Sequence, residues 1–254
     1  MNQWSGVSEA YRRSFATLCA GTIGEVLDRL PPGHLLDVGC GTGDLLEAAL
    51  QLGWDATGMD ADSDMVAISR AATPARVLHA ALPELPLPDA EFDAVAANFV
   101  INHVPDPRAA LADIARVTRA RGKIAVTIWP VGGGGWANLI GPVFSAADAG
   151  ALPATQLPAH LDFERTTKGL AGIAKDTGLT VTEACELTWT WHITPADLWA
   201  GISGGVATAG QTYLAQAPHI RERIAAGFTA RAADLANSGI LAFENRAVLV
   251  VAQR

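Results

Sequence analysis

The pattern of apolar and polar positions predicts strands that alternate with helices over the first 130 residues. Short apolar runs bounded by turn residues are typical of buried strands, and between them apolar residues recur at steps of three and four, which is typical of helices. The predicted strands are 34–38, 54–59, 75–79, 92–98 and 121–129. The predicted helices are 44–50, 63–72 and 107–120. Such alternation favours an α/β fold with a mostly parallel sheet.

The flanking segments predict further helices and two closing strands. Apolar positions at helical spacing predict one or two helices over residues 5–30, before the first strand. Helices are also expected at 163–177, which Gly178 would end, and at 215–236. A long strand is expected at 179–194 and a closing strand at 245–252. In the long strand Leu187, Trp189 and Trp191 share one face and Thr188, Thr190 and His192 share the other, and one of the two faces is expected to be buried.

Composition limits the kinds of partner. The chain has 254 residues, half of them apolar, so it is expected to bury a large core in one domain. Its net charge of −8 argues against a nucleic-acid surface, since phosphate binding relies on clustered Lys and Arg. No apolar run reaches the roughly 18 residues of a membrane span, and nothing marks the chain for export. We therefore expect a small-molecule partner, with the oligomeric state left open.

The cysteines indicate a reducing compartment. Cys19, Cys40 and Cys185 are scattered and form no C-x-x-C pair, which fits reduced thiols better than a disulfide or zinc framework. We therefore predict a cytoplasmic protein without a metal site.

A glycine-rich turn joins the first strand to the helix after it. Gly39, Gly41 and Gly43 alternate with other residues there, which lets the backbone approach a ligand closely, and the helix start offers unpaired N–H groups. The dinucleotide pattern G-x-G-x-x-G fails in either register, and the phosphate-loop lysine is missing. Asp37 before the glycines and Asp44 after them favour a ligand that carries positive charge.

The residues from Asp37 to Gly43 resemble the first motif, D/E-x-G-x-G-x-G, of the class I S-adenosylmethionine-dependent methyltransferases. A second carboxylate, Asp60, ends the next predicted strand, where an acidic residue can accept hydrogen bonds from ribose hydroxyls. The resemblance implies a seven-stranded, mostly parallel, doubly wound sheet with N-terminal helices and an inserted helical cap after the fifth strand. It also implies that the protein binds S-adenosylmethionine and transfers its methyl group, leaving S-adenosylhomocysteine.

The resemblance names the residues expected to hold the cofactor. They are Asp37, Gly39, Cys40, Gly41, Gly43, Asp60, Ala61, Met65, Ala81, Leu82, Asn98 and Phe99. Ala61 and Met65 would lie against the adenine, although Met65 can equally be an ordinary core residue. The family usually has an Asp at the position of Ala81, and an alanine cannot make the hydrogen bond of that carboxylate to the adenine. Backbone groups near Ala81 and Leu82 are therefore expected to bind the edge of the adenine ring. The backbone at Asn98 and Phe99 would lie near the methionine part.

The substrate side is less sharply defined. Residues 98–106 resemble the segment N/S-x-x-x-H-H-x-x-D of the same subfamily, which implies that Asn102 and His103 lie near the transferred methyl. His103 would act as a general base or would only brace its loop. Tyr11, Trp129 and His160 are further candidates for substrate contacts, and Trp4 and Phe15 either face the site or pack against the sheet.

The resemblance covers essentially the whole chain, with specific motifs in its first 130 residues. We expect one domain over 1–254, comprising a helical cover (1–30), a cofactor-binding core (31–130), a substrate-side insertion (131–178) and the C-terminal strands and helices (179–254). Four consecutive glycines after residue 131 predict a loop, either a lid hinge or simply a tolerant connection.

The predicted function is methylation of a small hydrophobic or aromatic metabolite. The alternatives are a non-catalytic protein that binds S-adenosylmethionine or S-adenosylhomocysteine, and a nicotinamide-dependent reductase on a related sheet.

Overall fold

The computed structural model describes residues 6–132, 134–152 and 157–254. The chain divides into two compact units. The sheet unit comprises Thr22–Gly132, Gln156–Leu187 and Arg246–Arg254, and the helical unit comprises Met1–Gly21, Gly133–Thr155 and Thr188–Asn245. The boundaries predicted for a single domain stay a prediction.

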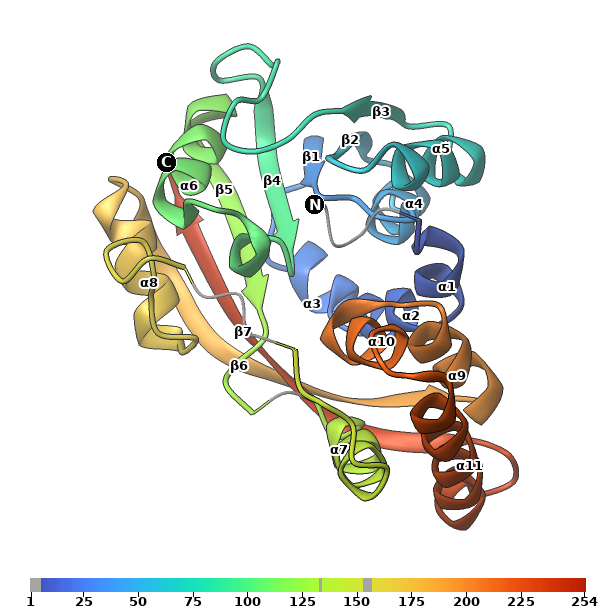
Figure 1. The fold of residues 1–254 in the computed structure, drawn as a ribbon. Coiled ribbons are helices and arrows are strands. Elements are labelled where there is room, and N and C mark those ends of the chain that lie inside the picture. Colours follow the sequence, from blue (N-terminus) through green and yellow to red (C-terminus); the bar gives the residue numbers. More distant parts are fainter. Residues whose placement is uncertain (1–5, 133, 153–156) are drawn as a thin grey trace. The chain divides into compact units, whose positions relative to one another are not determined.

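A seven-stranded sheet forms the centre of the sheet unit (Figure 1). Its strands are β1 (His34–Val38), β2 (Asp55–Asp60), β3 (Arg76–His79), β4 (Phe92–Asn98), β5 (Thr118–Ile128), β6 (Thr180–Ile193) and β7 (Leu241–Gln253). The strand order is β3-β2-β1-β4-β5-β7-β6. The first five strands in this order are parallel to their neighbours, and β7 runs antiparallel to β5. The predicted fold class is confirmed.

Helices cover both faces of this sheet. They are α3 (Ile23–Leu27), α4 (Asp44–Gln51), α5 (Ser63–Ala72), α6 (Pro107–Val117) and α8 (Thr167–Asp176), with a 3-10 turn, η1, at Ile101–His103. The helices α4 and α5 lie on one side of the sheet, and α6 and α8 lie on the other (Figure 1). Apolar side chains of β1, β4 and β5 are almost fully buried between these layers, so the strand tips are held rigidly.

Two of these helices begin as the sequence predicts. Asp62 caps α5 by accepting hydrogen bonds from the N–H groups of Asp64 and Met65. Asp106 caps α6 in the same way, and Pro107 takes the first helical position, where its missing N–H costs nothing.

The predicted end of α6 is wrong. The helix ends at Val117 rather than at residue 120, because Thr118 turns into the extended conformation and pairs with Phe92 of β4. The hydroxyl of Thr118 donates to the Ile114 carbonyl and so satisfies one of the last helical acceptors. Sheet pairing therefore overrides the helical pattern of residues 118–120.

The helical unit contains α1 (Ser8–Arg13), α2 (Phe15–Ala20), α7 (Ala137–Ala146), α9 (Pro195–Ser203), α10 (Ala207–Leu214) and α11 (Pro218–Leu235). Its core is aromatic: Phe15 packs edge-on against Trp136 and also contacts Trp191, whose indole N–H donates to Thr17. Phe15 is buried in this cluster, so it is a packing residue of this unit. Trp4 lies outside the described residues.

Three further predicted boundaries need correction. One or two helices were expected over 5–30, but the described residues 6–30 form three short helices. The helix expected from residue 163 begins at Thr167, because the Thr166 hydroxyl caps it by accepting the Gly169 N–H. The helix expected over 215–236 is α11, which begins at Pro218 and ends at Leu235. The preceding helix, α10, ends at Leu214. Among the described residues, no helix is long and apolar enough to cross a membrane.

Candidate functional site

The loop between β1 and α4 has glycine at three positions that do not suit other residues. Gly39, Gly41 and Gly43 have φ values of +68°, +52° and +96°, a region that L-residues rarely adopt. A Cβ at Gly39 would lie 2.5 Å from Val100 Cγ2, and one at Gly43 would lie 2.8 Å from Ser69 Oγ. At Gly39 and Gly43 the loop therefore packs too closely against Val100 and α5 to accept a side chain.

Asp60 joins the tip of β2 to this loop. One carboxylate oxygen accepts the Gly41 N–H at 2.9 Å and the other accepts the Asp62 N–H at 2.9 Å. Because β1 and β2 are parallel neighbours, with Val38 opposite Met59, both strands end at the same edge. Burial raises the pKa of Asp60, and the N–H bonds from Asp62 and Gly41 oppose that shift.

Asp37 is a buried carboxyl group at the end of β1. It is 2% exposed, and burial raises its pKa well above the usual range. The charges of Asp60 and Asp44 raise this pKa further; in the described part of the chain, no cation is found to offset them. Asp44 itself accepts a hydrogen bond from the Thr42 hydroxyl. A bound cation would relieve this accumulation of negative charge.

Cys40 lies under the loop and does not line it as a reactive thiol. Its side chain is buried, its Sγ donates to Ser69 Oγ at 3.8 Å, and burial raises the pKa of the thiol. A Cβ at Gly58 of β2 would lie 3.1 Å from the same sulfur. Cys40 is therefore a packing residue whose backbone belongs to the loop.

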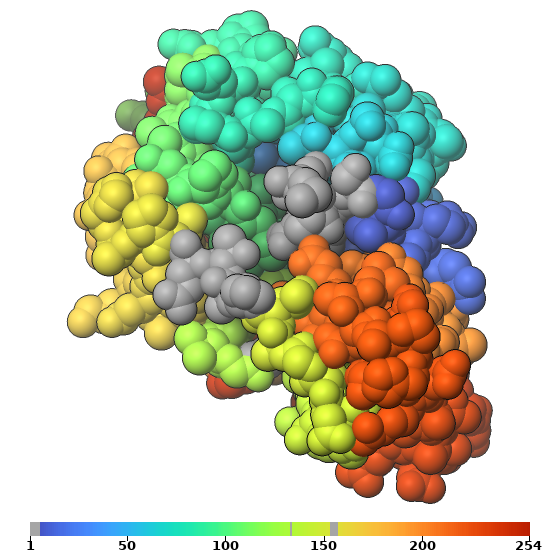
Figure 2. All heavy atoms as spheres, viewed as in Figure 1, coloured from blue at the N-terminus to red at the C-terminus, as the bar shows by residue number. Residues whose placement is uncertain are grey.

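The residues predicted to contact adenine follow β2 and β3 in the chain. Ala61 is exposed, and its carbonyl oxygen lies 3.1 Å from His79 Nε2. Met65 is 3% exposed in the first turn of α5, as expected for a packing residue as well as for a ligand contact. Ala81 is exposed and Leu82 half-buried, in the surface segment that follows β3 (Figure 2).

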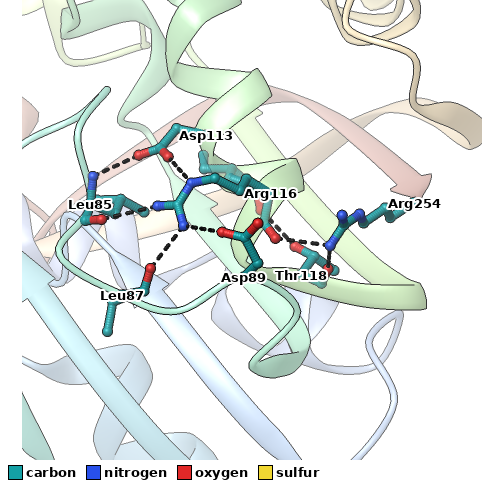
Figure 3. Close-up of polar contacts among 8 residues, drawn as sticks. Leu85, Leu87, Asp89, Asp113, Arg116, Thr118 and Arg254 are labelled. Atoms are coloured by element: carbon teal, nitrogen blue, oxygen red, sulfur yellow. Dashed lines mark hydrogen bonds and ion pairs between the residues drawn. The ribbon is translucent and has the colours of Figure 1, made fainter.

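Arg116 of α6 anchors that surface segment, and the sequence reasoning missed it. Its guanidinium donates to the carbonyl oxygens of Leu85 (3.0 Å) and Leu87 (2.8 Å) and pairs with Asp89 and Asp113 (Figure 3). Asp113 in turn accepts the Leu85 N–H at 2.7 Å. The signal was present as an Asp and an Arg three residues apart on one helix face.

Hydrogen bonds and ring stacking hold the tip of β4. Asn98 Oδ1 accepts from the hydroxyls of Thr22 (2.9 Å) and Thr127 (2.5 Å). Phe99 adopts a left-handed conformation, with φ +60°, and its N–H donates to Thr127 Oγ1 at 2.9 Å. The Phe99 ring stacks on Trp129, with centroids 4.0 Å apart and planes 13° apart. A non-glycine residue with positive φ at a strand tip indicates a backbone held in place by its surroundings.

Asn102 and His103 form a polar pair in η1. Asn102 Nδ2 lies 3.2 Å from His103 Nε2, and Asn102 Oδ1 is buried without a hydrogen-bond partner. The His103 side chain reaches solvent, yet the surrounding protein and the charge of Arg165 lower its pKa to about 4. His103 is therefore a neutral imidazole at pH 7 and a weaker base than a free histidine.

The remaining substrate candidates are spread over both units. Trp129 directly follows β5 in the sheet unit, and His160 is exposed in a turn before α8. Tyr11 is half-buried on α1 of the helical unit. The structure thus brings Asp37, Gly41 and Asp60 together at one sheet edge, while the roles of Tyr11 and His160 stay predictions.

Comparison with known proteins finds similarity to methyltransferases. Residues 36–126 match the model of a family described as a methyltransferase domain. An O-methyltransferase of Pyrenophora dematioidea is 37% identical over 114 residues, which is 40% of this chain and 42% of that protein. A demethylmenaquinone methyltransferase of Renibacterium salmoninarum is 31% identical over 121 residues, 47% of this chain and 49% of that protein. The chain thus matches less than half the length of each of these curated relatives.

Solved structures agree on the fold. Geranyl diphosphate C-methyltransferase from Streptomyces coelicolor A3(2) superposes with a TM-score of 0.52 at 13% identity, over 92% of this chain and 79% of that one. The [4+2]-cyclase SpnF superposes with a TM-score of 0.53 at 20% identity, over 94% and 81%. The sheet has the class I methyltransferase fold, and the match of residues 36–126 to a methyltransferase domain agrees with the resemblance seen in the sequence.

Proposed function

We propose that this protein is an S-adenosylmethionine-dependent methyltransferase that acts on a small molecule. One observation carries the proposal: the buried Asp37 and the half-buried Asp60, two carboxyl groups with raised pKa, lie beside a glycine loop that leaves no room for side chains at Gly39 and Gly43. The geranyl diphosphate and demethylmenaquinone methyltransferases named above act on small molecules, which agrees with the proposal.

The residues of the loop fit this cofactor. Its amino-acid end carries an ammonium group, and the unbalanced negative charge at Asp37 would bind it. Asp60 would accept hydrogen bonds from the ribose hydroxyls with the lone pairs that Gly41 and Asp62 leave unused. Met65 and the backbone at Ala81 and Leu82 would contact the adenine.

When bound, the cofactor supplies a methyl group on a positively charged sulfur, which a substrate nucleophile can attack in line. The protein has then mainly to align the two partners, and orientation can supply roughly 7–11 kcal/mol of such a barrier. The stacked pair of Phe99 and Trp129 would fix one wall, because both rings are held by the tips of β4 and β5. Neutral His103 would orient or accept the proton of the attacking group.

The test is a transfer assay with radiolabelled S-adenosylmethionine and a metabolite library, combined with calorimetric titration of the cofactor. Binding together with labelled product supports the proposal. Binding without transfer to any acceptor would favour the non-catalytic alternative, and tighter binding of NADH would favour the reductase.

A further inference from the structure

Arg165 lies in the turn that precedes α8, on the side of the sheet where η1 and α6 begin. Arg108, in the first turn of α6, donates to the Leu161 carbonyl at 3.4 Å and pairs with Asp176 of α8 at 3.0 Å. Phe163 packs against the core cluster of the same unit. These contacts fix the turn over the start of α6, four residues after His103.

The Arg165 side chain is held in one place. Its guanidinium carbon lies 3.9 Å above the centre of the Phe163 ring, and Nη1 donates to Asp162 at 2.8 Å and to the Phe163 carbonyl. The side chain is 22% exposed. For Nε and Nη2, the described part of the chain provides no acceptor. Arg165 is thus a positioned cation with hydrogen-bond donors left over.

The residues of η1 complete the arrangement. The positive charge of Arg165 lowers the pKa of His103, and the turn that carries Arg165 is joined to the start of α6 by the bond from Arg108 to Leu161. Asp162 pairs with Nη1 of the guanidinium and leaves Nε and Nη2 for a ligand. Asn102 Oδ1 is a buried acceptor without a partner, and such a group costs free energy until a donor reaches it. A guanidinium, an amide acceptor and a neutral imidazole therefore belong to one part of the sheet unit.

We propose that the methyl acceptor is an organic acid whose carboxylate or phosphate group binds Arg165 and whose hydroxyl or amine donates to Asn102 Oδ1. This inference rests on the proposed function, because it describes the acceptor of the same site. Arginine is suited to this role, since its planar donors match the two oxygens of an acid group and its charge does not depend on pH. A neutral aromatic acceptor would leave both the guanidinium donors and the amide oxygen unpaired.

The experiment follows the His103 ring proton by NMR in the full-length protein, with S-adenosylhomocysteine added. Its probes are benzoate, phenyl phosphate and the neutral benzamide, and a His103→Gln variant assigns the resonance. We expect at least one anion to shift the resonance with saturation, and benzamide to leave it unchanged. The two anions distinguish a carboxylate from a phosphate acceptor.

Variants make the result specific to Arg165. Arg165→Gln is expected to weaken binding of the responding anion about tenfold or more, while Arg165→Lys retains part of it. Arg246→Gln removes an exposed arginine of the same unit that pairs only loosely with Glu186, at 3.5 Å, and is expected to bind as the wild type does. Unchanged S-adenosylhomocysteine binding shows that each variant is folded.

Three results would overturn the inference: no response to either anion, an equal response to benzamide, or unchanged anion binding in Arg165→Gln. Failure of the proposed function has a different signature. There, S-adenosylhomocysteine itself does not bind to the wild type, whatever the anions do.

Discussion

The backbone N–H of Gly41 donates to the carboxylate of Asp60 at 2.9 Å. This bond joins the glycine loop to the tip of the neighbouring strand, so the two parts of the candidate cofactor site are held at a fixed separation. A ligand that binds both would find them already in position, which lowers the cost of ordering them.

Replacing Asp60 tests the ribose contact. Asp60→Ala removes both hydrogen-bond acceptors, and we expect the dissociation constant of S-adenosylmethionine, measured by calorimetry, to rise about tenfold or more. Asp55→Ala is the matched control, because Asp55 is exposed at the other end of β2. If Asp60→Ala binds as tightly as the control, Asp60 has no part in the site.

Asp37 makes cofactor binding depend on pH. Because its pKa is raised in the unliganded protein, the carboxyl group keeps its proton above the usual range, and a bound cation favours the ionised form. Binding should therefore release a proton, and affinity should rise with pH until the raised pKa is passed. Calorimetry in two buffers of different ionisation enthalpy measures the release, which Asp37→Asn should abolish. Proton uptake on binding would contradict this account.

The raised pKa of Asp37 also determines how the free energy of unfolding changes with pH. The folded, unliganded protein holds a proton on Asp37 that the unfolded chain has lost, so the free energy of unfolding should fall as the pH rises above about 4 toward the raised pKa. His103 acts in the opposite direction: its folded pKa of about 4 lies below the ordinary histidine pKa of 6.5, so its contribution to stability grows as the pH rises from about 4 to 6.5. Denaturant unfolding of Asp37→Asn and His103→Gln across pH 4–8 separates the two, and identical profiles for both variants would refute the assignment.

Gly39 should not tolerate a methyl group. Gly39→Ala combines an unfavourable φ with a Cβ 2.5 Å from Val100 Cγ2, and overpacking of this kind costs about 1–3 kcal/mol. Gly53→Ala is the control, because Gly53 also has positive φ, +79°, but nothing lies within 4 Å of its Cβ position. Thermal unfolding should show the larger loss at Gly39, and Gly39→Ala with Val100→Ala should recover part of it. An equal loss at both glycines would show that the contact with Val100 does not matter.

Arg116 should stabilise the segment after β3. Arg116→Met leaves the largely buried Asp113 without its cation and frees two carbonyl oxygens, so we expect a loss of about 2 kcal/mol in the free energy of unfolding. Arg246→Met, at an exposed pair, should cost less than about 1 kcal/mol. Denaturant titrations of both variants measure the difference, and equal losses would mean that Arg116 does not anchor the segment.

The sequence predicted the parts of the molecule that depend on local pattern. The span of β4, the first residues of α5 and α6 and the strand-to-helix position of the glycine loop all follow from residue types at short spacing. The end of α6 was wrong because pairing of Thr118 with Phe92 joins residues that are distant in sequence.

Two arginines of the sheet unit were not predicted from the sequence, because their roles depend on the folded structure. Arg116 binds the carbonyl groups of Leu85 and Leu87, which only the fold brings near it, so its spacing from Asp113 did not indicate that role. The partners of Arg165 are close in sequence, but no motif marks that residue. The lowered pKa of His103 likewise depends on its surroundings, which the sequence does not describe.

The central claim is that the glycine loop and Asp60 hold S-adenosylmethionine. The most direct measurement is a calorimetric titration of the purified protein with S-adenosylmethionine and, separately, with NADH. The account predicts saturable binding of S-adenosylmethionine at one site per chain, weakened by Asp60→Ala, and no binding of NADH at the same concentration. Absence of S-adenosylmethionine binding by the folded protein, or tighter binding of NADH, would contradict it.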